Sequence, residues 1–111
     1  MTAVAVLQDA LTRGGRVVWE PPDKPRLLAP PNLHEAIKAD RETVKEVLRR
    51  AAIFRQQAIR FLRHGGLFPI LALPDRPEGD GCTSCGITLN GRRYRCEVCA
   101  LAVALALGES I

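Results

Sequence analysis

CTSCGITLNGRRYRCEVC, residues 82–99, contains all four cysteines of a 111-residue chain. The cysteines form two Cys-x2-Cys pairs, Cys82 with Cys85 and Cys96 with Cys99, and ten residues separate the pairs. Each pair can bend so that both sulfur atoms face one point, and two such pairs at this separation are typical of tetrahedral zinc. The spacing therefore predicts a structural zinc site with all four thiolates as ligands.

Other uses of the cysteines are less consistent with the sequence. Disulfides conflict with a cytoplasmic location, which we expect because the N-terminal MTAVAVLQDA lacks the basic start and unbroken apolar core of a secretory signal. A redox Cys-x-x-Cys normally stands alone beside a βαβ pattern, which the sequence lacks. An iron–sulfur cluster also takes four thiolates, so spacing alone leaves it open. Four thiolates fill the coordination sphere of zinc, whereas catalytic zinc keeps an open position. We therefore expect a structural site.

The residues around the cysteines predict a small finger over residues 82–111. Asn90-Gly91 predicts a type I′ hairpin turn, because both central residues of that turn need positive φ. Short strands over 87–89 and 93–95 would return the second cysteine pair to the first. The sequence after Cys99, ALAVALAL, has high helix propensity and ends at Gly108. Knuckle, hairpin, knuckle and helix together resemble a treble-clef or zinc-ribbon finger.

The remaining sequence predicts an α+β fold, with a helix–hairpin–helix unit over residues 1–64. Hydrophobic spacing and glycine or proline stops predict, in order, a helix over 3–13, strands over 16–20 and 26–29, a short helix over 33–40 with Asn32 as its N-cap, and a long helix over 41–62. Seven residues at steps of three and four form a core-facing stripe on the long helix: Val44, Val47, Leu48, Ala51, Phe54, Ala58 and Phe61. A proline- and glycine-rich connector, residues 65–81, leads to the finger.

Residues 4–52 carry a succession of features that occur together in one known family. These are a Leu-rich first helix, Gly14-Gly15, the aromatic strand Val17-Val18-Trp19, the strand end Leu27 to Pro30, and two helices with Leu33, Ile37, Val44 and Leu48 at helical intervals. The pattern resembles the small docking domains, of the tubulysin-synthase type, at the N-termini of some nonribosomal peptide and polyketide synthase subunits.

This resemblance implies a homodimer with the order α-β-β-α-α, whose hairpin takes up a short, often acidic, terminal segment of a partner protein. The physical route would be strand addition at the hairpin edge, with basic side chains meeting the charges of the partner. The candidate partner-binding residues are Arg16, Lys24 and Arg26. Exposed basic residues are also common on strands without any partner.

Basic residues are concentrated in the N-terminal part of the chain. Residues 1–64 carry 12 Lys or Arg against 7 Asp or Glu, whereas residues 65–111 carry 4 against 5. Two groups are candidates for nucleic-acid contact: Arg41, Lys45 and Arg49, which recur every fourth residue of the long helix, and Arg92, Arg93 and Arg95 around Tyr94 in the finger. The first group can follow phosphates, and Tyr94 can stack on a base. A solvated helix face carries charges in any case.

Several functions are excluded or disfavoured by what the sequence lacks. It has no nucleotide-binding glycine loop, nucleophile elbow or metalloprotease helix motif, so we expect neither an enzyme nor a small-molecule substrate. The longest apolar run, residues 100–107, is far shorter than the roughly 20 residues that cross a bilayer. That segment is apolar almost all round, so it needs cover from residues 67–73, the long helix or a second copy.

The leading hypothesis from the sequence is a non-enzymatic cytoplasmic adaptor with a structural zinc site, homodimeric, that holds partner proteins together. The alternative is a small DNA-associated protein of the mobile-element or phage type, which would use the long basic helix and the finger.

Overall fold

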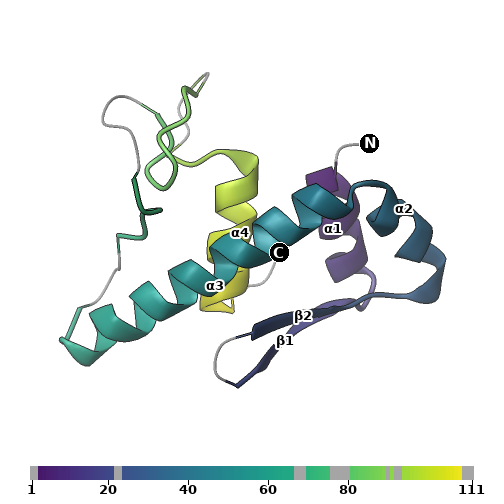
Figure 1. Cartoon of the computed structure of the whole chain (residues 1–111), viewed down its shortest axis with the longest axis horizontal. Helices are drawn as coiled ribbons and strands as arrows, with labels where there is room; N and C mark the ends of the chain where they lie inside the picture. The colour runs from purple at the N-terminus through teal and green to yellow at the C-terminus, as the bar shows by residue number, and fades with distance from the viewer. Residues whose placement is uncertain are drawn as a thin grey trace.

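Helix α3, Arg41–Arg63, is the longest element of the computed structural model, and the other elements are arranged around it (Figure 1). The structure describes residues 3–21, 24–66, 70–75, 81–89, 91 and 94–108. In chain order the elements are α1 (Ala3–Thr12), β1 (Arg16–Glu20), β2 (Lys24–Leu28), a 3-10 turn (Pro31–Leu33), α2 (His34–Ala39), α3 and α4 (Glu97–Leu107). The fold is α+β with the predicted order α-β-β-α-α, followed by the four-cysteine region and α4.

Strands β1 and β2 form an antiparallel hairpin in which Arg16 lies opposite Leu28 and Glu20 opposite Lys24. Side chains alternate between the two faces of a strand. Val17 and Trp19 of β1 therefore share one face, and both pack against the apolar core. The hairpin begins and ends close to the predicted residues, although β2 starts two residues earlier than expected.

The buried stripe of α3 confirms the predicted periodicity. Val44, Val47, Ala51, Phe54 and Ala58 are buried, and Leu48 packs half-buried against the same cluster. The helix ends at Arg63, and a Cβ atom at Gly66, three residues later, would overlap the ring of Phe61. Glycine at that position therefore lets the chain turn back closely past the last turn of α3.

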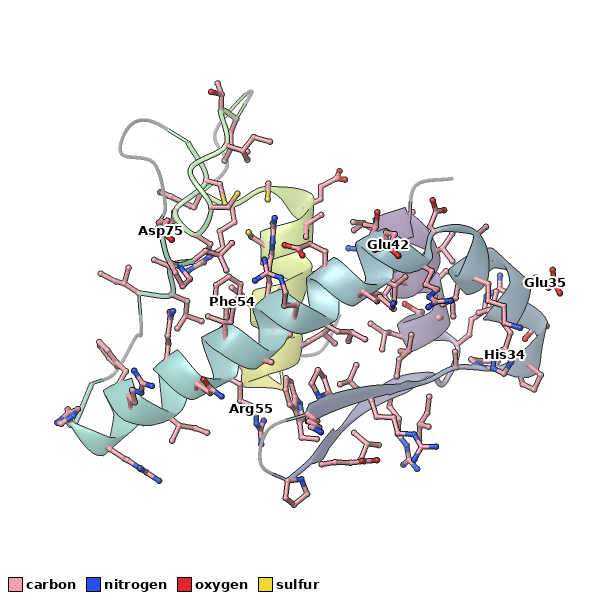
Figure 2. All side chains as sticks on the ribbon, viewed as in Figure 1. His34, Glu35, Glu42, Phe54, Arg55 and Asp75 are labelled. Carbon is pink, nitrogen blue, oxygen red and sulfur yellow. The ribbon has the colours of Figure 1, made fainter. Side chains whose placement is uncertain are left out.

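Helix α4 lies across the middle of α3 and also contacts α1 (Figure 1). Its buried residues are Cys99, Leu101, Ala102, Val103, Leu105 and Ala106. They join Val4, Leu7 and the α3 residues from Val47 to Ala58 of the buried stripe in one apolar cluster, with the fully buried Phe54 where α3 crosses α4 (Figure 2). The all-round apolar character of α4 is thus explained by cover from α3 and α1 within one chain.

Residues 71–72 of the predicted connector pack against the rest of the fold. Leu71 is fully buried in the core cluster. The side chain of Gln57 on α3 clamps Ala72 by accepting from its backbone N–H at 2.9 Å and donating to its carbonyl. Residues 71–72 therefore lie against α3, whereas residues 67–69 lie outside the described part of the chain.

Three local predictions differ from the structure. Asn32 is not a helix N-cap: it lies inside the 3-10 turn, and α2 begins at His34 without a side-chain cap. Pro31, whose φ suits a first helical turn, starts that turn before Asn32. Helix α4 begins at Glu97 rather than after Cys99. The described parts of the predicted finger hairpin, residues 87–89 and 94–95, contain no strand, while its Asn90 lies outside the described residues.

Candidate metal centre

The four cysteine sulfur atoms lie together, all within 4.8 Å of one another. The Cys85 and Cys96 sulfurs, one from each pair, are 3.7 Å apart. A tetrahedral zinc ion with bonds of about 2.3 Å holds its sulfur ligands roughly 3.8 Å apart. The donor set therefore fits a metal ion of this size, and Figure 2 shows the sulfurs grouped at the N-terminal end of α4.

The first pair forms a knuckle that the local sequence dictates. The backbone N–H of Cys85 donates to the Cys82 sulfur at 3.4 Å, and the N–H of Gly86 donates to the Cys82 carbonyl at 2.8 Å. Gly86 has a φ of 79°, a left-handed conformation that suits glycine. The chain can therefore reverse immediately after Cys85 and direct both sulfurs to the same point.

The second pair is built into the start of α4. Cys96 is the N-cap residue, and its sulfur accepts a hydrogen bond from the backbone N–H of Cys99 at 3.4 Å. Negative charge at this position is stabilised by the unpaired amides and the dipole of the helix. A cysteine sulfur thus takes the place of the serine or aspartate oxygen that usually caps a helix, and Cys99 follows in the first turn.

Hydrogen bonds join the two knuckles to each other and to the core. Thr83 donates from its backbone N–H to the carbonyl of Tyr94 at 2.7 Å. Arg95 donates through Nε to the hydroxyl of the fully buried Ser84 at 3.0 Å, and Ser84 donates to the carbonyl of Leu71 at 2.9 Å. The first knuckle is therefore joined by hydrogen bonds to the second knuckle and to residues 71–72, which lie against α3.

The surroundings influence the ionisation of the thiols in opposite directions. Burial opposes ionisation of Cys82, but backbone N–H groups, including that of Cys85, outweigh it and lower the pKa of Cys82 to about 6. Burial raises the pKa of Cys85 and that of Cys99, and the neighbouring Cys96 raises the pKa of Cys99 further. Thiols packed this closely resist carrying several negative charges, which is the condition that a bound divalent cation relieves.

One residue at this site was not predicted from the sequence. Arg50 of α3 donates through Nη1 to the Cys99 sulfur at 3.2 Å, across 49 positions of sequence. The same guanidinium donates through Nε to Glu46 at 2.7 Å. The spacing of Glu46 and Arg50 on a helix predicts their ion pair, but no sequence signal links Arg50 to the cysteines.

The candidate partner-binding residues all lie on one face of the hairpin. Arg16, Lys24 and Arg26 are exposed, and the strand register places them on the face opposite to Val17 and Trp19. Glu20 shares that face and pairs with Arg26 at 3.3 Å. The structure therefore places the three basic residues on one face of the hairpin, with Arg16 at one end and Lys24 at the other.

The candidate nucleic-acid residues are placed in different surroundings. Arg41, Lys45 and Arg49 are exposed on α3, and Arg49 donates to Glu46 through two nitrogens, at 2.9 and 2.6 Å. Arg95 is half-buried and donates to Ser84, as described above. Arg92 and Arg93 lie outside the described residues.

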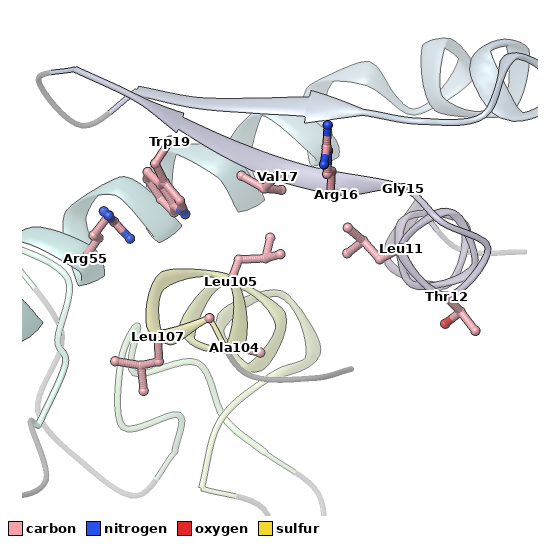
Figure 3. Close-up of a pocket in the computed structure, with 11 residues that line it drawn as sticks. Leu11, Thr12, Gly15, Arg16, Val17, Trp19, Arg55, Ala104, Leu105 and Leu107 are labelled. Atoms are coloured by element: carbon pink, nitrogen blue, oxygen red, sulfur yellow. The ribbon is translucent and has the colours of Figure 1, made fainter.

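A second feature, an open groove of about 590 Å³, lies between the hairpin and the last turn of α4 (Figure 3). Its lining residues are Leu11, Thr12, Gly15, Arg16, Val17, Trp19, Arg55, Ala104, Leu105, Leu107 and Gly108. The guanidinium of Arg55 stacks on the Trp19 ring, 4.5 Å from its centroid. Sequence reasoning found the hairpin but not this groove, because its walls come from four separate elements.

Comparison of the chain with protein-family models, with curated proteins and with solved structures found no match. No family match therefore supports the resemblance of residues 4–52 to docking domains. Among the described helices, none is long and apolar enough to cross a membrane.

Proposed function

We propose that this protein is a non-enzymatic docking adaptor whose fold is held by a structural zinc ion. The observation that supports docking best is the groove beside β1. Among the described residues, β1 pairs only with β2, so its other edge offers unpaired backbone groups. The groove runs beside β1, with Val17 and Trp19 on one side and the end of α4 on the other.

The chemistry of the groove favours an acidic segment in extended conformation. Such a segment can add to β1 as a third strand and place alternate side chains on the apolar surface of Trp19 and Leu105. Among the described residues, the charged side chains that line the groove are Arg16 and Arg55, and none of the described lining residues is acidic. Complementary charge would therefore select acidic partners and speed their association.

Zinc is the metal that the donor set favours. Four thiolates at tetrahedral separation form a soft and closed ligand sphere, which suits a structural role and leaves no position for a substrate. Elemental analysis of the purified protein tests this assignment. One zinc per chain is expected, whereas iron together with sulfide would indicate an iron–sulfur cluster instead of zinc.

The docking proposal is tested by nuclear magnetic resonance on the zinc-loaded protein. The probe is a short synthetic peptide that alternates valine with glutamate, and the control peptide has lysine in place of glutamate. We expect the acidic peptide alone to shift the amide signals of Arg16–Glu20 and of the last turn of α4. Absence of these shifts would argue against strand addition at this edge.

Matched variants locate the binding face. Trp19→Ala removes the largest apolar contact in the groove and should weaken the acidic peptide about tenfold, as aromatic anchors typically do. Val18→Ala alters the same strand on its opposite face and should leave the affinity unchanged. Equal losses in both variants would mean that the hairpin, not the groove, determines binding.

The homodimer implied by the resemblance remains part of the proposal, although α4 no longer supports it. That helix is covered by α3 and α1 of its own chain. Light scattering at micromolar protein concentration tests the dimer, and a monomer there would remove this part of the proposal.

Nucleic-acid contact is the second candidate function, supported by the exposure of Arg41, Lys45 and Arg49 on α3. A random-sequence DNA duplex is the probe. Binding at low salt that falls steeply as salt is added would support phosphate contacts. No binding at low salt would eliminate this candidate.

A further inference from the structure

The contact between Arg50 and Cys99 joins the metal centre to the helix that organises the fold. The Cys99 side chain is fully buried, and the Arg50 side chain is only 19% exposed. Their 3.2 Å separation is short for a donor to sulfur. The pair is therefore a largely desolvated hydrogen bond between a cation and a metal-binding sulfur.

The carboxylate of Glu46 holds the Arg50 guanidinium in place for this contact. Glu46 accepts from Arg50 Nε at 2.7 Å, while Nη1 of the same planar group donates to sulfur. A guanidinium offers its donors in a rigid fork, so fixing one edge also directs the other. Glu46 also accepts two bonds from Arg49, which lies farther out.

Charge explains what this arrangement can do. Four thiolates around a divalent cation carry a net charge of about −2, and a buried uncompensated charge is costly. A cation that donates to a metal-bound thiolate offsets part of that charge. The positively charged guanidinium of Arg50 contacts the sulfur of Cys99, which is fully buried.

We propose that Arg50 is an outer-sphere positioning residue of the metal centre: it neutralises part of the charge of the four thiolates, orients Cys99 and couples metal affinity to the folding of α3. The inference rests on the metal centre of the proposed function and is independent of docking. Arg50 also lines a hollow of about 420 Å³ together with Cys85 and Cys96, the two half-buried ligands. Removing its side chain should therefore also make the metal easier for a chelator to extract.

The chain supplies a matched control. Arg49 and Arg50 both bind Glu46, but Arg50 alone of the two donates to a sulfur in the structure. Arg50→Gln should lower zinc affinity by about tenfold or more, the range found when partners of metal ligands are removed. Arg49→Gln should change it by less than twofold. Competition with a chromophoric chelator measures both affinities, and circular dichroism confirms that each zinc-loaded variant is folded.

Cobalt(II) gives a readout that a purely structural role of Arg50 would not move. The hydrogen bond stabilises the sulfur lone pair, so its loss in Arg50→Gln should shift the sulfur-to-cobalt charge-transfer band to longer wavelength. Arg49→Gln should leave the band in place. If Arg50→Gln does not fold, Arg50→Lys keeps one charge without the rigid fork and should show a smaller loss of affinity and a smaller shift.

The outcomes separate the inference from the proposal on which it rests. A wild-type protein that binds neither zinc nor cobalt overturns the metal centre itself. Metal binding that is equal in the wild type and Arg50→Gln, with an unchanged cobalt band, overturns the role of Arg50 alone. Equal losses in Arg49→Gln and Arg50→Gln also overturn it, because the effect would then come from the α3 surface and not from the sulfur contact.

Discussion

The described parts of residues 3–66 and of residues 81–96 are organised by different means. The first region consists of helices and a hairpin whose apolar side chains meet at regular intervals, so helix and sheet hydrogen bonds satisfy most of its backbone. Among its described residues, the second has no helix or strand, and its backbone N–H groups donate instead to the Cys82 sulfur and to the carbonyls of Tyr94 and Ile87. Hydrophobic periodicity organises the first region, whereas the second region depends on the convergence of four cysteine sulfurs on one site.

Helix α4 makes the two regions depend on each other. Its first turn carries Cys99, its middle covers the buried stripe of α3, and its last turn lines the groove beside β1. A metal that fixes the start of α4 therefore also fixes the cover of Phe54 and one wall of the groove. Perturbing the metal, the core and the surface in turn tests this dependence.

Metal removal should have the largest effect. Structural zinc contributes on the order of 10 kcal/mol in small zinc domains. Without it the closely packed thiols lose their common partner, α4 leaves α3, and the stripe around Phe54 is exposed. We expect chelation to abolish hydrogen-exchange protection of α3 amides as well as those of α4, and added zinc to restore it. Protection of α3 that persists in chelator would show that residues 3–66 fold independently.

Phe54→Ala should have the next largest effect because the ring is fully buried at the crossing of α3 and α4. Loss of a buried aromatic ring lowers the free energy of unfolding by about 3–5 kcal/mol. Leu62→Ala is the control on the same helix, since Leu62 is 59% exposed and should cost less than about 0.5 kcal/mol. Urea unfolding with excess zinc compares the two, and similar values would place the stabilising contacts of α3 elsewhere.

The success of the sequence predictions follows the same division. The α3 stripe and the cysteine spacing are local patterns that neighbours along the chain determine, and the structure confirms the burial of five of the seven stripe residues and the meeting of the four sulfurs. The contact of Arg50 with Cys99 depends on how α4 crosses α3, and no spacing records that crossing. The start of α4 at Glu97 was missed because Cys96 caps the helix with sulfur, a role that sequence patterns assign to serine, threonine, asparagine or aspartate.

Ser84→Ala should have an intermediate effect. The buried hydroxyl donates to Leu71 and accepts from Arg95, so its removal leaves both of these groups without that partner. An unsatisfied buried polar group costs about 1–3 kcal/mol. Thr88→Ala, at an exposed position of the same region, is the control and should be close to neutral. Equal stability of the two variants in thermal unfolding would mean that the metal alone holds the first knuckle.

Arg26→Gln should have the smallest effect on stability, and for that reason it distinguishes two ways of using the hairpin. Arg26 and Glu20 pair at 3.3 Å with side chains 68% and 48% exposed, and such surface pairs contribute about 0–1 kcal/mol. Arg16→Gln should likewise leave stability unchanged, but Arg16 lines the groove and Arg26 does not. Binding of the acidic peptide should therefore weaken in Arg16→Gln and persist in Arg26→Gln. Equal weakening in both variants would indicate that the peptide binds the outer face of the hairpin and not the groove. Docking would then not depend on α4 or on the metal.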